Sequence, residues 1–327
     1  MSVFSINQDA VRIVTEQILP VADRLQCRVV TLDNGATVVD MGVEAPGGWL
    51  AGRRFVEATI GGLGSVGFGT FRAIDFTVPS IDVHVDQPQT ACLSSQFSGW
   101  RMSESDKSDG IVPIGSGPAR AIARNDIFSQ AWTYADRHHA TVFGAQTTKL
   151  PSEQFVDEVA AACGVEPANV YVLAARTGSL AGSIQVCSRS VEASIWRIHR
   201  KGFDISKVKS AMGTCPLPPV VRDELTAMHR VNTALLYGVS VRFVVDCDDE
   251  EIEQVIDALP FNASGRFGER FIDLFDEGDR DFYQVDKDVH TVAVYEVWNE
   301  ASGNTFRAGE IREDMLSDAF FGACPGR

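Results

Sequence analysis

Segments with the hydrophobic period of a strand and segments with that of a helix alternate along the whole chain. Residues 27–42 alternate around Asp33-Asn34-Gly35, which is the chemistry of a tight hairpin turn between two strands. Residues 150–164 instead have helical spacing, with Ser152 as the N-cap and Gly164 as the stop. The sequence therefore predicts a mixed α and β (α+β) fold.

Length and charge narrow the class of protein further. The 327 residues are comfortable for two domains, and we predict an N-terminal domain over 1–150 and a C-terminal domain over 151–327, although chain crossing between domains would upset that boundary. The formal net charge of −15 argues against nucleic-acid and membrane-surface partners, which need a basic field. An anionic ligand would have to meet a local cationic pocket.

The chain shows no targeting, disulfide or metal-binding pattern. Its first twenty residues lack a basic segment followed by an apolar core, and no stretch approaches the ~20 apolar residues of a membrane span. The seven cysteines are scattered without a CxxC pair, and the histidines form no HExxH pattern. We expect a cytoplasmic protein with reduced thiols and no metal site.

A charged pair opens the helix predicted over residues 188–202. Arg189 and Glu192 are three residues apart, so their side chains are neighbours on the helix surface. Cationic residues and Gly202 mark the end of this helix. Spacing alone is typical of a surface ion pair worth a few tenths of a kcal/mol.

Three loop segments are candidate binding regions. Small polar residues occur at 94–96, and residues 115–121, GSGPARA, permit close backbone approach to an anion beside Arg120. That segment lacks the Walker lysine, so a nucleotide triphosphatase is not supported, and it also fits an ordinary loop-to-helix junction. The third segment leads from a buried strand at 169–174 into the helix at 188–202.

Four motifs in this order, ACLSSQFSGW, GSGPARA, SLAGSIQVCSRSVEASI and GTCPLPP, resemble the methenyltetrahydromethanopterin cyclohydrolases over nearly the whole chain. The resemblance implies hydrolysis of the cationic methenyl bridge of a reduced pterin to a formyl group, in one-carbon metabolism. It also implies a subunit of two mixed α and β domains, with the pterin in the cleft between them, and assembly as a homotrimer.

The resemblance assigns roles by motif position. It implies that Arg189 and Glu192 are catalytic, and we expect Glu192 to activate a water as general base while Arg189 orients its carboxylate. No cofactor or metal is needed, because the substrate carbon is already an electrophilic cation. The implied substrate-binding residues are Ser94, Ser95, Gln96, Gly115, Ser116, Gly117, Arg120, Ser183 and Gln185.

Two alternatives remain open. The chain could be a catalytically silent pterin- or nucleotide-binding protein, or a cyclohydrolase for a folate-type carrier. For each binding residue alone, a serine cap or a packing glycine is an equally good interpretation.

Overall fold

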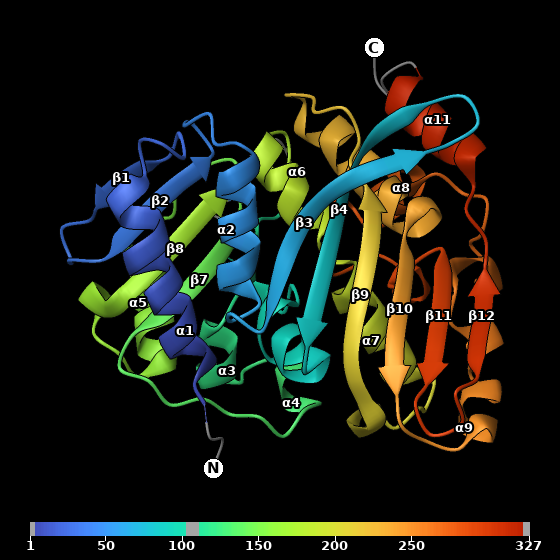
Figure 1. The fold of residues 1–327 in the computed structure, drawn as a ribbon. Coiled ribbons are helices and arrows are strands. Elements are labelled where there is room, and N and C mark those ends of the chain that lie inside the picture. Colours follow the sequence, from blue (N-terminus) through green and yellow to red (C-terminus); the bar gives the residue numbers. More distant parts are fainter. Residues whose placement is uncertain (1–3, 103–110, 323–327) are drawn as a thin grey trace. The chain divides into compact units, whose positions relative to one another are not determined.

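The computed structural model describes residues 4–102 and 111–322, which divide into two compact units (Figure 1). Unit 1 comprises Met1–Gly64 and Thr90–Gln185, and unit 2 comprises Ser65–Gln89 and Val186–Arg327. The chain thus passes between the units at three places. A cut at residue 150 would separate two paired strands of unit 1, and the predicted boundary there stays a prediction.

Unit 1 contains a six-stranded mixed sheet in the order β1-β2-β8-β7-β6-β5. The three central strands β2, β8 and β7 are parallel, and the flanking pairs are antiparallel. The strands are β1 (Arg28–Thr31), β2 (Thr37–Gly42), β5 (Trp100–Arg101), β6 (Ile114–Ser116), β7 (Thr141–Gln146) and β8 (Val170–Ala175).

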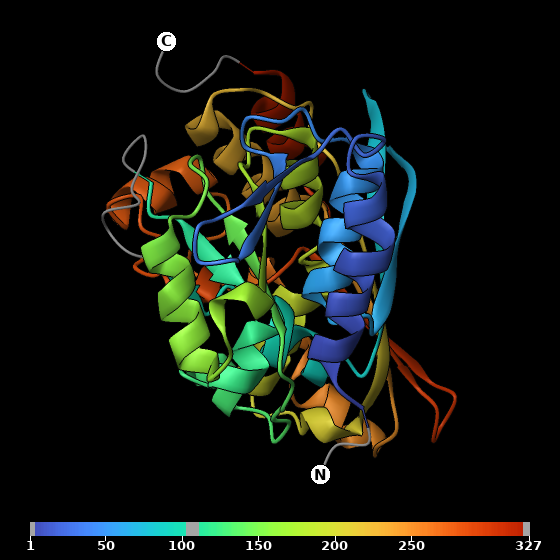
Figure 2. The same cartoon turned by 90° about the vertical axis from the view of Figure 1, so that its left-hand side faces the viewer.

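Helices cover both faces of this sheet, as the edge-on view in Figure 2 shows. Successive residues of a strand point to opposite faces, so Val39 joins one hydrophobic core and Val38 the other. The first core is closed by α1 (Ile6–Arg12), the π-helix η1 (Ile13–Ile18) and α2 (Trp49–Thr59), and the second by α3 (Ala119–Ala123) and α5 (Glu153–Cys163). Unit 1 also contains α4 (Ile127–Gln130) and most of η3 (Gln89–Gln96) and α6 (Leu180–Cys187).

Unit 2 contains the second six-stranded mixed sheet, in the order β12-β11-β10-β9-β4-β3. Strands β10 and β11 are parallel, whereas β9 pairs antiparallel with both β4 and β10. The strands are β3 (Gly64–Arg72), β4 (Thr77–Asp86), β9 (Val208–Pro216), β10 (Ser240–Val245), β11 (Val294–Asn299) and β12 (Thr305–Gly309).

Helix α7 (Ser190–Arg200) packs on β9, β10 and β4, and α8 (Glu224–Gly238) packs on β9. Helices α10 (Phe271–Glu277) and α11 (Glu313–Phe321) pack in turn against α8. The hydrophobic side chains of α7 that face the sheet are fully buried, Val191 and Ile195 among them. Packing on the sheet of unit 2 therefore holds the first turns of α7 in place.

Local sequence signals proved accurate where caps and turns decide the structure. Ser152 accepts a hydrogen bond from the Phe155 amide, and Gly164 ends α5 with φ +64°. The hairpin turn at Gly35 has φ +86°. These confirm the predicted helix over 150–164 and the hairpin over 27–42, and the fold is mixed α and β.

The sequence also predicts a helix over residues 248–260 and another that begins near residues 91–95, and both differ from the structure. The segment after Cys247 forms only the short α9 (Asp249–Glu253) followed by 3₁₀ turns, and residues 89–96 form a π-helix, η3, rather than an α-helix. Within 4–102 and 111–322, none of the helices is long and apolar enough to cross a membrane. Six of the seven cysteines are free thiols, and Cys324 lies outside the described residues.

Candidate active site

Arg189 and Glu192 meet at the start of α7, as their spacing predicts. Arg189 is the N-cap residue and Glu192 lies in the first turn, where a carboxylate is favoured by the helix dipole. The Arg189 Nη1 donates a hydrogen bond to Glu192 Oε1 over 3.0 Å. The N-cap position of Arg189 and the first-turn position of Glu192 thus bring two opposite charges together at the N-terminal end of α7.

This pair is buried, which the spacing did not reveal. The two residues are only 6% and 5% exposed. A surface pair of this spacing is worth little, whereas charges removed from water cost several kcal/mol each before their attraction is counted. Burying this pair at the start of a helix therefore costs desolvation free energy that a surface pair does not. Such a position is consistent with a chemical role for the pair.

The predicted binding residues 94–96 lie in η3. Ser95 Oγ donates to the Thr59 carbonyl over 2.6 Å, and the Ser95 carbonyl accepts from the Gly117 amide. Ser94 is fully buried and its hydroxyl has no hydrogen-bond partner among the described residues. A π-helix is uncommon and frequently accompanies functional sites, so Ser94 remains a candidate for contacting a ligand.

The glycines at 115 and 117 fit tightly against β7. A Cβ at Gly115 would lie 2.2 Å from the Phe143 ring, and Gly117 has φ +103° with β7 backbone atoms 3.1 Å from its absent Cβ. Ser116 Oγ donates to the Gly144 carbonyl over 3.3 Å. These contacts give each glycine a packing reason, and their binding roles stay predictions.

Arg120 is fully buried and its guanidinium faces protein groups. It donates to both carboxylate oxygens of Asp126 and to the carbonyls of Leu93 and Ser95. Burial raises the pKa of Asp126, but the Arg120 charge and the hydrogen bonds from Arg120 and Ser129 outweigh it, so this pKa lies below its ordinary value. Arg120 therefore supports the backbone of η3, and contact between Arg120 and a substrate stays a prediction.

Ser183 and Gln185 join a polar network at the carboxyl ends of β7 and β8. Ser183 Oγ donates to the Thr177 carbonyl, and Gln185 Nε2 donates to Gln146 Oε1 over 3.0 Å. Gln146 Nε2 donates in turn to Thr177 Oγ1 over 2.7 Å. Ligands of open α/β sheets bind at this edge of parallel strands.

Gln146 and Thr177 are polar residues of this network that the sequence analysis missed. Gln146 is the last residue of β7 and Thr177 comes two residues after the end of β8, and this position at the end of a buried parallel strand was the available signal. By residue number, the nine predicted binding residues belong to unit 1, whereas Arg189 and Glu192 belong to unit 2. Each of the contacts described above joins two residues of the same unit.

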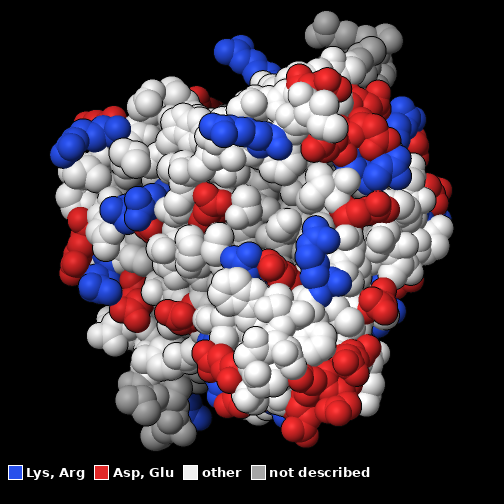
Figure 3. Space-filling model, turned by 45° about the vertical axis from the view of Figure 1, so that its right-hand side comes forward, with Lys and Arg blue, Asp and Glu red and all other residues white. Residues whose placement is uncertain are grey.

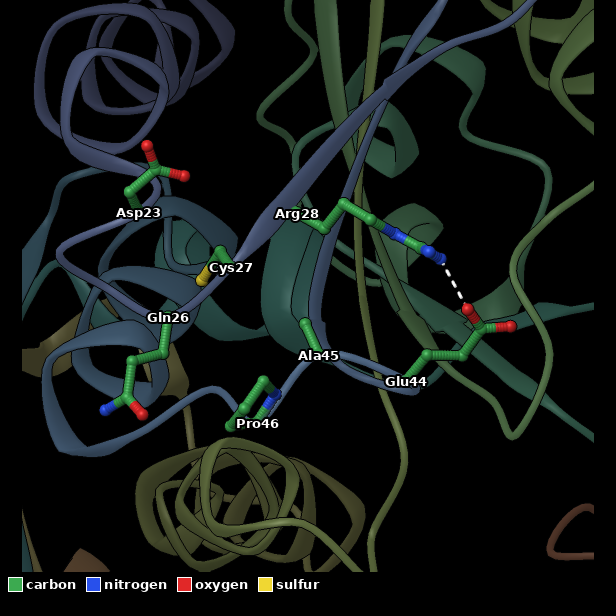
Figure 4. Close-up of a pocket in the computed structure, with 7 residues that line it drawn as sticks. All are labelled: Asp23, Gln26, Cys27, Arg28, Glu44, Ala45 and Pro46. Carbon is green, nitrogen blue, oxygen red and sulfur yellow. Dashed lines mark hydrogen bonds and ion pairs between the residues drawn. The ribbon is translucent and has the colours of Figure 1, made fainter.

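An open pocket of about 550 Å³ in unit 1 contains none of the predicted site residues (Figure 4). Its Arg28 side chain extends to the carboxylate of Glu44, and burial followed by the charge of Asp40 raises the pKa of Cys27 to about 12. A thiol with such a pKa is not a nucleophile near neutral pH. The pocket is lined by Asp23, Gln26, Cys27, Arg28, Glu44, Ala45 and Pro46.

Figure 3 shows acidic side chains gathered densely at the lower edge of the face it presents, whereas basic side chains are more scattered. Among the described residues, no group of three or more His, Cys, Asp or Glu side chains could hold a metal ion.

Comparison with known proteins gives one consistent result. Residues 5–320 match the family model described as Cyclohydrolase (MCH). The chain is 36% identical to the methenyltetrahydromethanopterin cyclohydrolase of Methanothermobacter marburgensis over 97% of its length and 99% of that protein. It is 35% identical to the enzyme of the same name from Methanocaldococcus jannaschii, over 95% of its length and 97% of that protein.

A third relative, the methenyltetrahydromethanopterin cyclohydrolase of Methanospirillum hungatei, is 35% identical over 88% of the chain and 90% of that protein. The family-model match spans both units and every predicted site segment. On this evidence the chain belongs to the cyclohydrolase (MCH) family.

Proposed function

We propose that this protein hydrolyses methenyl-tetrahydromethanopterin to formyl-tetrahydromethanopterin, reversibly, in one-carbon metabolism. Support comes from family membership over residues 5–320 and from relatives of that name covered almost end to end. The observation that carries the catalytic assignment is the buried contact of 3.0 Å between Arg189 and Glu192.

The reaction requires few catalytic groups from the protein. The methenyl carbon lies between two nitrogens that share a positive charge, so it already accepts a nucleophile. The reaction needs a water held against that carbon and a group to take its proton. A metal, a nicotinamide or a covalent nucleophile has no necessary part in such a reaction.

Glu192 is the base in this proposal. Water oxygen bonds to the methenyl carbon while Glu192 takes a proton, which gives a neutral tetrahedral adduct. One carbon–nitrogen bond then breaks, its electron pair remains on the ring nitrogen, and Glu192 returns a proton there. The second proton leaves the hydroxyl as the formyl carbonyl forms, so the sum is cation plus water to formyl product plus one proton.

Arg189 holds the Glu192 carboxylate in one orientation. Its Nη1 donates to Oε1 over 3.0 Å, and the carboxylate oriented in this way holds the water in the proposal. A fixed base contributes about 10²–10⁴ in rate, since the position of the carboxylate is set before the substrate arrives.

The test is the decay of methenyl-tetrahydromethanopterin absorbance with wild type and with Glu192→Gln. The amide keeps the shape of the side chain but cannot accept the proton, so kcat should fall by about 10²–10⁴ while KM changes only a few-fold. Asp273→Asn is the matched control, because Asp273 pairs with Arg270 at the same three-residue spacing but on the surface. Turnover in Glu192→Gln equal to wild type would exclude Glu192 as the base.

Two other functions remain distinguishable by the same assay. A methenyl-folate substrate tests the folate-type carrier, and a higher kcat/KM for that carrier would replace the pterin in the proposal. Tight binding of methenyl-tetrahydromethanopterin without turnover would favour the catalytically silent binding protein instead.

Several expectations from the resemblance belong to this proposal. They are a homotrimer, a cytoplasmic location, a pterin bound in a cleft between two domains, and activity without a cofactor. Sedimentation equilibrium tests the trimer, and turnover by metal-depleted protein tests the cofactor. The binding roles of the nine unit 1 residues stay predictions as well.

A further inference from the structure

Gly213 lies in the middle of β9, a central strand of the unit 2 sheet. It pairs with Val241 on β10 and with Val83 on β4. Its backbone is ordinary strand, without the positive φ that requires glycine. Glycine weakens a strand interior, so its presence there indicates that something approaches the backbone closely.

The first residue of α7 makes that approach. A Cβ added at Gly213 would lie 2.1 Å from Ser190 Oγ and 2.6 Å from Ser190 Cβ, whereas ordinary contact is 3.4–4 Å. The next nearest atom, Val191 Cγ2, would be at 3.4 Å. Ser190 therefore rests on the bare backbone of β9, and only the absence of a side chain at residue 213 allows it.

This contact is steric, because polarity does not explain it. Ser190 is fully buried, and its hydroxyl has no hydrogen-bond partner among the described residues. Ser190 stands between Arg189 and Glu192, one residue from the first and two from the second. Any outward displacement of Ser190 must carry both charged residues with it.

The other end of α7 is held separately. Arg197 donates to the carbonyls of Leu259 and Ala258 and to Asp288. Ile198 is also buried. Because these contacts hold the last turns of α7 in place, a side chain added at residue 213 would displace mainly the first turn.

We infer that Gly213 is a positioning residue, which sets the depth of the first turn of α7 and thereby the location of Arg189 and Glu192. The inference rests on the proposed function, in which that pair activates water. A misplacement of about 1 Å in catalytic groups can cost about 10²-fold in rate. Packing on β9, rather than the ion pair alone, then determines where the base stands.

The experiment compares the kinetics of wild type, Gly213→Ala and Gly67→Ala on methenyl-tetrahydromethanopterin. We expect Gly213→Ala to lower kcat by about 10–100-fold, with KM within about threefold of wild type, because the base moves more than the binding loops. Gly67→Ala is the matched control in the same sheet, since its new Cβ would make only ordinary contacts, with Asp82 Cβ at 3.8 Å and the Asp82 carbonyl oxygen at 3.9 Å. It should retain wild-type kcat.

Rescue separates positioning from a general loss of structure. Ser190→Gly removes both overlapping atoms, so Ser190→Gly with Gly213→Ala should recover the kcat of Ser190→Gly alone. A folded Gly213→Ala protein with wild-type kcat, or a loss that Ser190→Gly does not rescue, would overturn the inference. Absence of turnover in wild type would instead contradict the proposed function.

Should Gly213→Ala alone fail to fold, Ser190→Ala with Gly213→Ala takes its place, since only the Cβ overlap at 2.6 Å then remains. Its kcat should fall about tenfold below that of Ser190→Ala. Equal kcat values for these two folded variants would count against the positioning role.

Discussion

Arg189 and Glu192 are joined by a hydrogen bond of 3.0 Å at a helix start where both residues are more than nine-tenths buried. Each charge has given up its hydration, and the other charge is a principal compensation for that loss. Removing one partner thus takes this compensation away from a buried charge, which is far more costly than losing a surface pair.

Arg189→Met should therefore destabilise the protein by about 3–5 kcal/mol, because the Glu192 carboxylate is left without its cation. Adding Glu192→Gln should recover a large part of that free energy of unfolding, while turnover stays lost. Urea unfolding of the single and double variants, with kcat measured on the folded proteins, gives both values.

The exposed pair Arg270 and Asp273 provides the reference for this prediction. Both side chains are about half exposed, and Arg270→Met should change the free energy of unfolding by about 1 kcal/mol or less. Equal effects of Arg189→Met and Arg270→Met would mean that the Arg189 charge is not compensating a buried carboxylate.

Arg120 invites a second prediction, because its guanidinium holds η3 by two carbonyls, those of Leu93 and Ser95, and is itself held by Asp126. Arg120→Lys keeps the charge but loses the planar fork, at about 1–3 kcal/mol for each buried acceptor left unsatisfied. Both Arg120→Lys and Asp126→Asn should raise the KM for substrate, because both changes release the backbone of η3.

Thermal unfolding and KM of the two variants check this account. The Asp126 pKa is lowered in the folded protein, so its contribution to stability is present above the ordinary value of 3.8 and is lost as pH falls through the folded pKa. A raised KM in Arg120→Lys, with unchanged KM in Asp126→Asn, would point to direct substrate contact by Arg120 instead.

Local signals were sufficient for much of the secondary structure. The Ser152 cap, the Gly35 turn and the Gly164 stop act over a few residues, and each occurs as expected. The contact between Arg189 and Glu192 is equally local. Such features depend on neighbouring residues, which the sequence displays directly.

Features that depend on distant segments could not be predicted in this way. The burial of Arg189 and Glu192 follows from the packing of α7 on the sheet of unit 2. Arg120 finds the carbonyls of Leu93 and Ser95 on a segment about 25 residues away. The reason for a glycine at 213 likewise appears only when Ser190 is seen on the opposite side of the contact.

His229 gives a prediction about pH. It is buried on α8, where burial first, and the nearby Arg270 charge second, lower its pKa from 6.5 to about 4. Arg230 acts in the same direction, whereas Asp318 and Asp273 oppose it. The folded protein thus keeps this imidazole neutral at a pH where the unfolded chain protonates it.

The sign follows from that difference. Above pH 6.5 the imidazole is neutral in both states and contributes no pH dependence. As pH falls from 6.5 to about 4, the imidazole binds a proton in the unfolded chain but not in the folded protein. The free energy of unfolding therefore falls, by on the order of 3 kcal/mol in all. Below about pH 4 both states are protonated and this loss stops.

His229→Gln should flatten the fall in unfolding free energy between pH 6.5 and 4, since the amide does not titrate. His290, whose pKa is also lowered to about 4 by burial and by Arg200 and Lys287, should leave a residual slope in the same window. Urea unfolding at half-unit pH steps measures both contributions. A slope in His229→Gln as steep as that of wild type would show that His229 takes up its proton equally in the folded and unfolded states.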